Sequence, residues 1–355
     1  MIQFMANKST ILIHNIYYML SYAFQELGKN NYANIKGEEF EHVMDLFAEI
    51  LYRGISEQLK QGLFKEYISK SESSSTFRGR LAINGTIRNI IQHKRKLDCE
   101  FDELSVDNLY NRILKSTMLL LIRRSEVDSK RKNQLRSILS FFNDIEEVGL
   151  KDIRWSGFNF QRNNRNYRML MNICYFIVDG LLLTTDSGDL RMPAFSEEHM
   201  NRLFERFVLN YYKRHYPVLR PNADSIKWNI VAEEDSEGID LIPSMQSDIA
   251  LHSKDHKLII DTKYYGKILQ GQFGKRTIHS AHMYQIYAYV KNLDIEQKGN
   301  VSGMLLYAQT TEGVMPVLDC NMGGNKIMVR TLDLNKEFSY IQAQLDKIIT
   351  DVFSI

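Results

Sequence analysis

The stretch Met245-Gln-Ser-Asp-Ile-Ala-Leu-His-Ser-Lys-Asp-His-Lys-Leu-Ile-Ile-Asp-Thr-Lys-Tyr264 contains two apolar runs separated by a polar segment. The runs at 245–251 and 257–263 are rich in β-branched and aliphatic residues, which favours β-strands. The polar segment between them predicts a turn, so the whole stretch predicts a β-hairpin. Its second strand is apolar enough to lie in the centre of a sheet, and the fold is organised around it.

Three charged side chains in this hairpin form a candidate metal site. Side chains alternate along a strand, so Asp261 and Lys263 project from the same face. If Asp248 lies on that side of the facing strand, two carboxylates can hold a hard cation such as Mg²⁺, with the Thr262 carbonyl as a further oxygen. The metal would activate water for attack on a phosphodiester, and Lys263 would orient that water and offset phosphate charge.

The alternative is an exposed hairpin with ordinary surface charges. The apolar flanks argue against it, because charged residues are seldom buried without a partner or a metal. The residues therefore favour a metal-dependent nuclease centre with Asp248, Asp261 and Lys263 as catalytic residues.

Two helical segments flank the hairpin. Upstream, Glu205 borders an apolar stripe of helical spacing, and it either reaches the metal site or is a solvated carboxylate near Arg202 and Arg206. Downstream, Gln285-Ile-Tyr-Ala-Tyr289 predicts a helix that carries a glutamine and a tyrosine on one side. Glu205, Gln285 and Tyr289 are therefore possible supporting residues for metal, water or phosphate contacts.

The pattern D…D-x-K followed by Q-x-x-x-Y resembles the PD-(D/E)xK nuclease superfamily. An apolar strand at 303–308 follows the second helix, which gives the order helix, hairpin, helix, strand. The resemblance implies an α/β core of the restriction-endonuclease type.

Longer motifs make nearly the whole chain resemble the McrC family, the nuclease subunits of modification-dependent restriction systems. These motifs are Asn15-Ile-Tyr-Tyr-Met-Leu20, Tyr22-Ala23, Gly79-Arg80, Thr86-Ile-Arg88, Asn111-Arg-Ile-Leu-Lys-Ser-Thr117, Asp261-Thr-Lys-Tyr-Tyr265 and Tyr284-Gln285. The resemblance implies cleavage of double-stranded DNA that carries modified cytosine, such as 5-methylcytosine. It also implies a partner, an McrB-like AAA+ GTPase ring, which the chain would contact through its N-terminal domain and stimulate.

The chain has no G-x-x-x-x-G-K-[ST] motif, so we expect it to bind no nucleotide itself. Its 44% hydrophobic and 25% charged residues are typical of a globular protein. Three isolated cysteines and an uncharged stretch at 9–25 without a basic leader predict a cytoplasmic protein with no membrane association.

Six basic residues and no acidic residue lie between Arg78 and Lys96. Within this segment, Arg80 and Arg88 are candidate contacts to the partner or to phosphate. Internal ion pairs of these arginines with Asp98, Glu100 or Asp102 are the alternative.

We predict two domains. Residues 1–162 should form an α+β partner-docking domain, mostly helical, with short strands near 64–69 and 95–101 and a flexible loop at 71–76. Residues 163–355 should form the α/β PD-(D/E)xK nuclease domain, with the boundary in the polar run 161–166.

Two other functions are compatible with parts of this pattern. A RecB-like exonuclease working with a helicase shares the D…D-x-K and Q-x-x-x-Y patterns. A non-catalytic adaptor that docks on a motor would need the nuclease fold only as a scaffold, but the intact Asp248, Asp261 and Lys263 set argues against that function alone.

Overall fold

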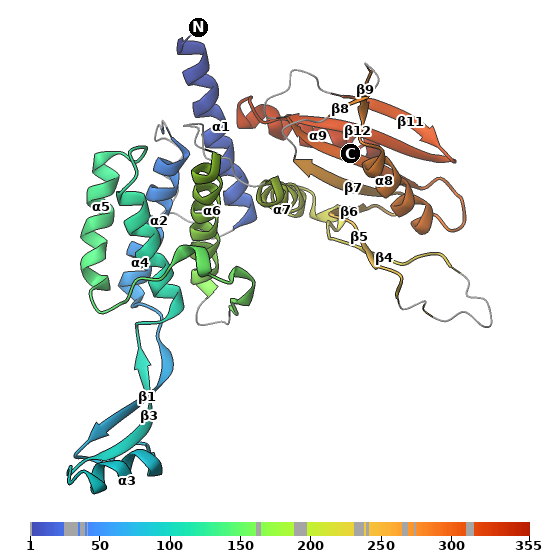
Figure 1. Ribbon diagram of the computed structural model, residues 1–355. Helices are drawn as coiled ribbons and strands as arrows, with labels where there is room; N and C mark the ends of the chain where they lie inside the picture. The colour runs from blue at the N-terminus through green and yellow to red at the C-terminus, as the bar shows by residue number, and fades with distance from the viewer. Residues whose placement is uncertain are drawn as a thin grey trace. The chain divides into compact units, whose positions relative to one another are not determined.

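The computed structural model describes residues 2–24, 35, 40, 42–160, 165–187, 197–230, 238, 241–264, 269–272, 275–309 and 316–355 (Figure 1). The chain forms two compact units. The sheet unit comprises Met1–His42 and Pro193–Ile355, and the helical unit comprises Val43–Met192.

Four helices build the body of the helical unit: α2 (Val43–Gln61), α4 (Leu109–Ile122), α5 (Ser129–Leu139) and α6 (Arg165–Ser187). Short 3₁₀ turns at Ser140–Phe142, Leu150–Asp152 and Trp155–Gly157 follow α5. The side chain of Asn108 caps α4 by accepting a bond from the Asn111 N–H. Asn111 also accepts a 2.7 Å hydrogen bond from the Tyr167 hydroxyl, which ties α6 to α4 through a buried polar contact.

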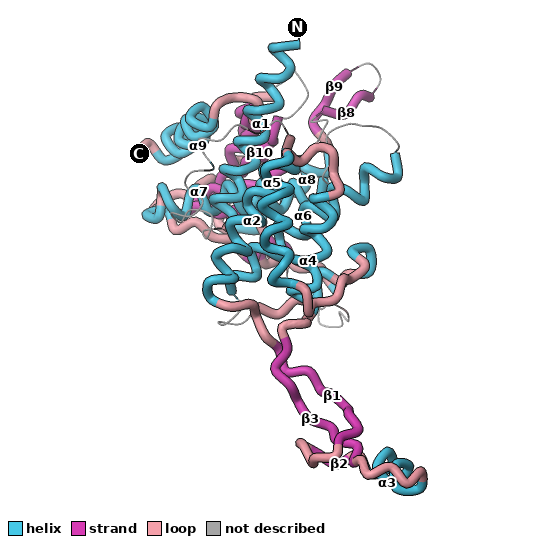
Figure 2. The backbone as a smooth tube through the Cα atoms, turned by 90° about the vertical axis from the view of Figure 1, so that its left-hand side faces the viewer, coloured by secondary structure: helices cyan, strands magenta, loops and turns pink. Residues whose placement is uncertain are grey.

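An arm extends from these helices, as Figure 2 shows. It consists of β1 (Glu66–Ser74), β2 (Arg80–Leu81), α3 (Ile83–Ile91) and β3 (Leu97–Ser105), with the sheet order β1-β3-β2. The two predicted strands are confirmed but are longer than expected. The predicted flexible loop at 71–76 is wrong in part, because Ser71 to Ser74 pair with Glu100 to Leu97 in a regular antiparallel ladder.

The sheet unit contains a five-stranded sheet of order β11-β12-β10-β7-β6. Its strands are β6 (Ile249–His252), β7 (Lys257–Tyr264), β10 (Val301–Gln309), β11 (Leu318–Met322) and β12 (Asn325–Asp333). The predicted hairpin is confirmed as the antiparallel pair β6 and β7, and β7 pairs in parallel with β10 on its other side. The second strand of the hairpin is therefore central, as its apolar sequence predicts. Two small ladders, β4 (Ser225–Ile226) with β5 (Met245–Gln246) and β8 (Leu269–Gln272) with β9 (Lys275–Ile278), complete the strands.

Helices cover both faces of this sheet. Helix α8 (Ser280–Leu293) packs over β7 and β10 on the face that carries Asp261. Side chains alternate along β7, so Tyr264 lies on the opposite face of the sheet from Asp261. There its ring contacts Phe204 of α7 (Glu197–His215). Helix α9 (Phe338–Phe353) joins α7 through a 2.7 Å hydrogen bond from the Tyr211 hydroxyl to Asp346.

Helix α1 (Ile2–Ala23) belongs to the sheet unit although it begins the chain. The buried Asn15 side chain donates hydrogen bonds to the carbonyls of Leu334 and Lys336, at 2.7 and 2.8 Å. The helix also packs on α7. These hydrogen bonds satisfy two backbone carbonyls just after β12. They give Asn15, the first residue of the motif at 15–20, a structural role in the fold.

The two units depart from the predicted ranges 1–162 and 163–355. Helix α1 groups with the C-terminal sheet because of its contacts with α7, whereas α6 groups with the helical unit because it packs on α2 and α4. The polar run proposed as the boundary lies mostly outside the described residues. In the part of the chain that is described, no helix combines the length and apolarity needed to span a membrane.

Candidate active site

The site lies where β7 runs past the end of its partner β6. Pairing of the two strands ends at Ile249 and Ile260, so the backbone N–H of Thr262 has no partner from the β6 ladder. The Asp248 carboxylate fills this place: its Oδ2 accepts bonds from the Thr262 N–H and hydroxyl, both at 2.7 Å. These bonds fix Asp248 beside β7 and leave its Oδ1 for another contact.

Asp261 occupies the centre of the site. Its side chain is 1% exposed, and its Oδ2 lies 2.8 Å from Nζ of Lys263. Its Oδ1 is buried and accepts no hydrogen bond from any residue that the structure describes. Burial, followed by repulsion from Asp248, raises the pKa of Asp261 to about 6. The structure therefore brings Asp248, Asp261 and Lys263 together, as the sequence predicts.

Helix α8 supplies the next contacts. Oε1 of Gln285 accepts a 3.0 Å hydrogen bond from Nζ of Lys263, and its Nε2 donates a 2.8 Å bond to the Tyr289 hydroxyl. Both ends of the amide are thus engaged, which fixes the oxygen toward the lysine. Gln285 and Tyr289 lie in the site, and they contact it through Lys263.

Glu205 approaches from α7. Burial raises the pKa of its carboxyl to about 7, with further contributions from the charges of Asp248 and Asp261. Glu205 is half-buried, and the charges of Arg206 and Arg202 act in the opposite direction and lower its pKa. Glu205 thus lies within electrostatic range of the two aspartates, and its contact with a metal stays a prediction.

A divalent cation fits the chemistry of these donors. Asp261 presents a buried carboxylate oxygen without a hydrogen-bond donor, and Asp248 presents a second oxygen close to it, which is the donor type that Mg²⁺ prefers. Within the described residues, no three His, Cys, Asp or Glu side chains form a metal cluster by themselves. Two carboxylates would thus need an oxygen of another kind, and the Thr262 carbonyl stays a prediction for that position.

Tyr307 and His282 also lie near Lys263, although the sequence marked neither of them as a site residue. Tyr307 of β10 is in register with Lys263 and is fully buried, and its hydroxyl lies 2.8 Å from Nδ1 of His282. Burial, together with the charges of Lys263 and His279, lowers the pKa of His282 to about 4. One feature of the sequence points to His282: it lies three residues before Gln285, so both side chains lie on one side of the helix.

The arm carries the predicted contact residues Arg80 and Arg88. Both are exposed, and neither forms an ion pair with a residue in the described chain, so the internal pairs with Asp98, Glu100 or Asp102 are not formed. Asp98 instead accepts a 2.8 Å hydrogen bond from Asn89.

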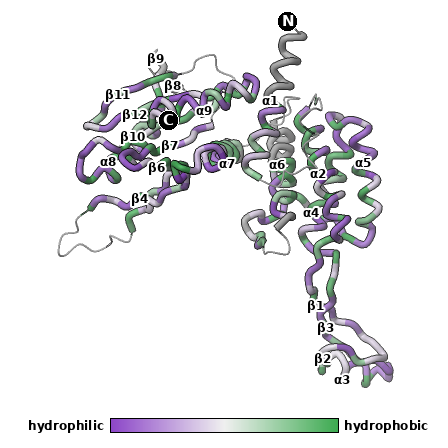
Figure 3. Tube along the Cα trace, turned by 180° about the vertical axis from the view of Figure 1, so that it is seen from behind, coloured by the Kyte–Doolittle hydropathy of each residue, from purple (hydrophilic) through white to green (hydrophobic). Residues whose placement is uncertain are grey.

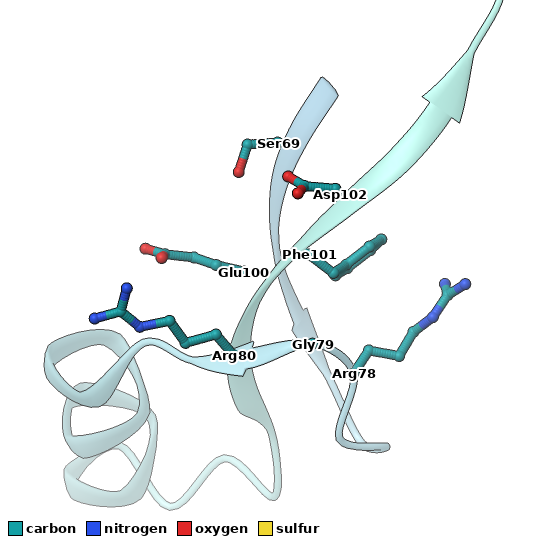
Figure 4. Close-up of a pocket in the computed structure, with 7 residues that line it drawn as sticks. All are labelled: Ser69, Arg78, Gly79, Arg80, Glu100, Phe101 and Asp102. Carbon is teal, nitrogen blue, oxygen red and sulfur yellow. The ribbon is translucent and has the colours of Figure 1, made fainter. Parts of the chain in front are cut away.

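Seven residues of the arm line a shallow pocket of about 650 Å³: Ser69, Arg78, Gly79, Arg80, Glu100, Phe101 and Asp102. Figure 4 shows Arg80 and Glu100 extending to one side of the sheet, and Arg78 and Phe101 to the other. Gly79 crosses between them with φ +62°, and an added Cβ would meet the Glu100 carbonyl oxygen at 2.4 Å. Only glycine fits this crossing, which explains the Gly-Arg motif.

Helix α3 of the arm has an apolar side without a cover among the described residues. It is formed by Ile83, Ile87, Ile90 and Ile91, which are 49–72% exposed. In Figure 3 the tip of the arm carries hydrophobic as well as hydrophilic residues. Exposed apolar side chains rimmed by charge are typical of protein interaction surfaces.

Comparisons with known proteins identify relatives of this chain. The family model described as "McrBC 5-methylcytosine restriction system component" matches residues 6–308. The chain is 29% identical over 340 residues to the "Type IV methyl-directed restriction enzyme EcoKMcrBC" of Escherichia coli (strain K12), covering 95% of this chain and 97% of that protein. The solved half-complex of Thermococcus gammatolerans McrB AAA+ hexamers with bound McrC matches with a TM-score of 0.52 and 19% identity, covering 95% of this chain and 76% of that one. At that identity the structural match shows a shared fold.

Proposed function

The chain belongs to the McrBC 5-methylcytosine restriction system component family, and on that premise we propose that it is the DNA-cutting subunit of such a system. It acts as a Mg²⁺-dependent endonuclease on double-stranded DNA that carries modified cytosine, in complex with an McrB-like AAA+ GTPase. It binds no nucleotide itself.

The surroundings of Asp261 support the proposal that this chain itself cleaves the DNA. The Asp261 carboxylate is 1% exposed, and one of its oxygens accepts no hydrogen bond from the described residues. It touches Lys263, which Gln285 of α8 holds in place. Burying an ionised carboxylate in this way is unfavourable, because it loses hydration. An unfavourable arrangement of this type is expected where a metal or a substrate completes the site.

The residues divide the chemistry of phosphodiester hydrolysis among them. Asp248 and Asp261 would hold Mg²⁺, with the Thr262 carbonyl as a third oxygen and Glu205 as a supporting carboxylate. When bound, the ion would polarise the phosphate and lower the pKa of nearby water. Lys263, held by Gln285, would orient the attacking water and offset negative charge on the phosphate. Tyr289 fixes the Gln285 amide for this task.

We propose that the arm docks on the partner ring. The arm presents the α3 isoleucines together with Arg80 and Arg88, which form no ion pair among the described residues. This combination suits a protein surface that has an apolar groove with an acidic rim. Buried apolar contact would supply affinity, and the arginines would supply orientation. Docking there would couple the chain to GTP hydrolysis by the partner.

A closed plasmid tests the proposal. The chain, its purified AAA+ partner, GTP and Mg²⁺ should cut covalently closed DNA that contains 5-methylcytosine and leave unmethylated DNA intact. Degradation of linear DNA only would indicate an exonuclease, and stimulated GTP hydrolysis without any cleavage would indicate an adaptor. Either of these two results would reject the proposed function.

A further inference from the structure

Gly303 lies at the closest approach of α8 to the sheet. It is in β10, and in the parallel register it lies beside Ile259 of β7. A Cβ atom built at Gly303 would meet Ile286 Cγ1 and Val290 Cγ2 of α8, both at 2.8 Å, and Ile327 Cδ1 at 3.0 Å. These neighbours are fully buried, so none can move into solvent. The missing side chain is what allows the helix to lie at this height above the sheet.

The two residues that pack on Gly303 directly follow the two polar residues of the site. Ile286 follows Gln285, and Val290 follows Tyr289. An α-helix moves as a rigid element over one turn, so the height of Ile286 above Gly303 also sets the height of Gln285 above β7. The 3.0 Å bond between Gln285 and Lys263 depends on that height.

We infer that Gly303 is a positioning residue for cleavage, which acts through α8 by holding the Gln285 side chain within hydrogen-bond distance of Lys263. This inference rests on the proposed role of Lys263 in the reaction. Gly303 touches neither DNA nor metal in this assignment.

The displacement follows from the contact distances. Ordinary van der Waals contact of a Cβ begins near 3.4 Å, so the 2.8 Å contacts must each open by 0.6 Å in Gly303→Ala. If α8 rises by this amount, the Lys263 to Gln285 distance grows from 3.0 Å to about 3.6 Å, which is too long for a hydrogen bond. A misplacement of this size can reduce a catalytic rate by about tenfold to a hundredfold.

A double-mutant cycle tests the inference in the full chain with its partner. Gly303→Ala should lower the single-turnover rate of plasmid cleavage by about tenfold or more, while GTPase stimulation is unchanged. In a Gln285→Ala background the same substitution should have no further effect on the rate. Full activity of Gly303→Ala, or equal rate losses in both backgrounds, would overturn the inference. An absence of cleavage by the unaltered chain would instead reject the proposed function.

A second measurement does not depend on cleavage. Acylation of Lys263 by an amine-reactive ester, followed by peptide mass spectrometry, should be faster in Gly303→Ala and in Gln285→Ala, relative to the exposed Lys298. Ile349→Val in α9 is the control, because it removes a buried methyl group from another helix and should leave Lys263 unchanged. Should Gly303→Ala fail to fold, the same cycle applies to Gly303→Ala with Val290→Ala, which removes one of the contacting methyl groups. Unchanged Lys263 reactivity in the folded variant would contradict the inference.

Discussion

Replacing Asp261 by Asn should stabilise the metal-free chain and abolish cleavage. The carboxylate is 1% exposed, and one of its oxygens accepts no hydrogen bond from the described residues. Asn has almost the same shape, carries no charge, and keeps an oxygen that can accept a bond from Lys263. The substitution removes a costly buried charge together with a metal ligand, so stability and activity should change in opposite directions.

The size of the expected gain in stability follows from the raised pKa of the Asp261 carboxyl. Its pKa rises from an ordinary 3.8 to about 6 in the fold, so the folded chain binds the proton more tightly than the unfolded chain. Stability therefore falls as the pH rises from about 4 to about 6 and stays low above that range. The difference corresponds to about 3 kcal/mol. Lys263 loses its counter-charge in the variant, which reduces the net gain to about 1–3 kcal/mol.

Thermal unfolding in EDTA measures this gain. Trp155 lies in the helical unit and Trp228 in the sheet unit, so a Trp155→Phe background leaves Trp228 fluorescence as a reporter of the sheet unit. At pH 8 Asp261→Asn should melt higher by about 2–4 °C per kcal/mol, and the advantage should shrink toward pH 4. Mg²⁺ should raise the melting temperature of the unsubstituted chain but not that of the variant.

Asp319 provides the matched control. A hydrogen bond from Arg330 lowers the pKa of Asp319, so Asp319→Asn should give no gain at pH 8. A lower melting temperature of Asp261→Asn than of the unsubstituted chain, in EDTA at pH 8, would refute the argument that this buried charge is unfavourable.

Three further outcomes are expected. Alanine at Asp248, Asp261 or Lys263 should reduce plasmid cleavage by at least about a hundredfold and leave partner assembly and GTP hydrolysis unchanged, and full cleavage by Asp261→Ala would reject the site. The isolated chain with Mg²⁺ and methylated DNA should show little specific cleavage and no GTPase activity, which a nuclease assay and phosphate release would check. Arg80→Ala and Arg88→Ala should weaken GTPase stimulation at an unchanged melting temperature, because both arginines are exposed and form no ion pair among the described residues. A large fall in melting temperature would point to a structural role instead.

The sequence alone determined the local elements around the site. Two apolar runs around a polar segment defined the hairpin of β6 and β7, and the apolar second run identified β7 as a central strand. The alternation of side chains along a strand placed Asp261 and Lys263 on one face. The spacing of Gln285 and Tyr289 placed both on one side of a helix, where they form a hydrogen bond. These features follow from the periods of strands and helices, which depend on neighbours a few residues apart.

Only the tertiary structure decided which distant elements meet. It grouped α1 with the C-terminal sheet through Asn15 and assigned α6 to the helical unit. It also brought Glu205 within electrostatic range of the aspartates, and it placed Ile286 and Val290 of α8 against Gly303 of β10. These outcomes depend on contacts between residues far apart in the chain. Shape and burial select those contacts, and the spacing of residues along the sequence does not predict them.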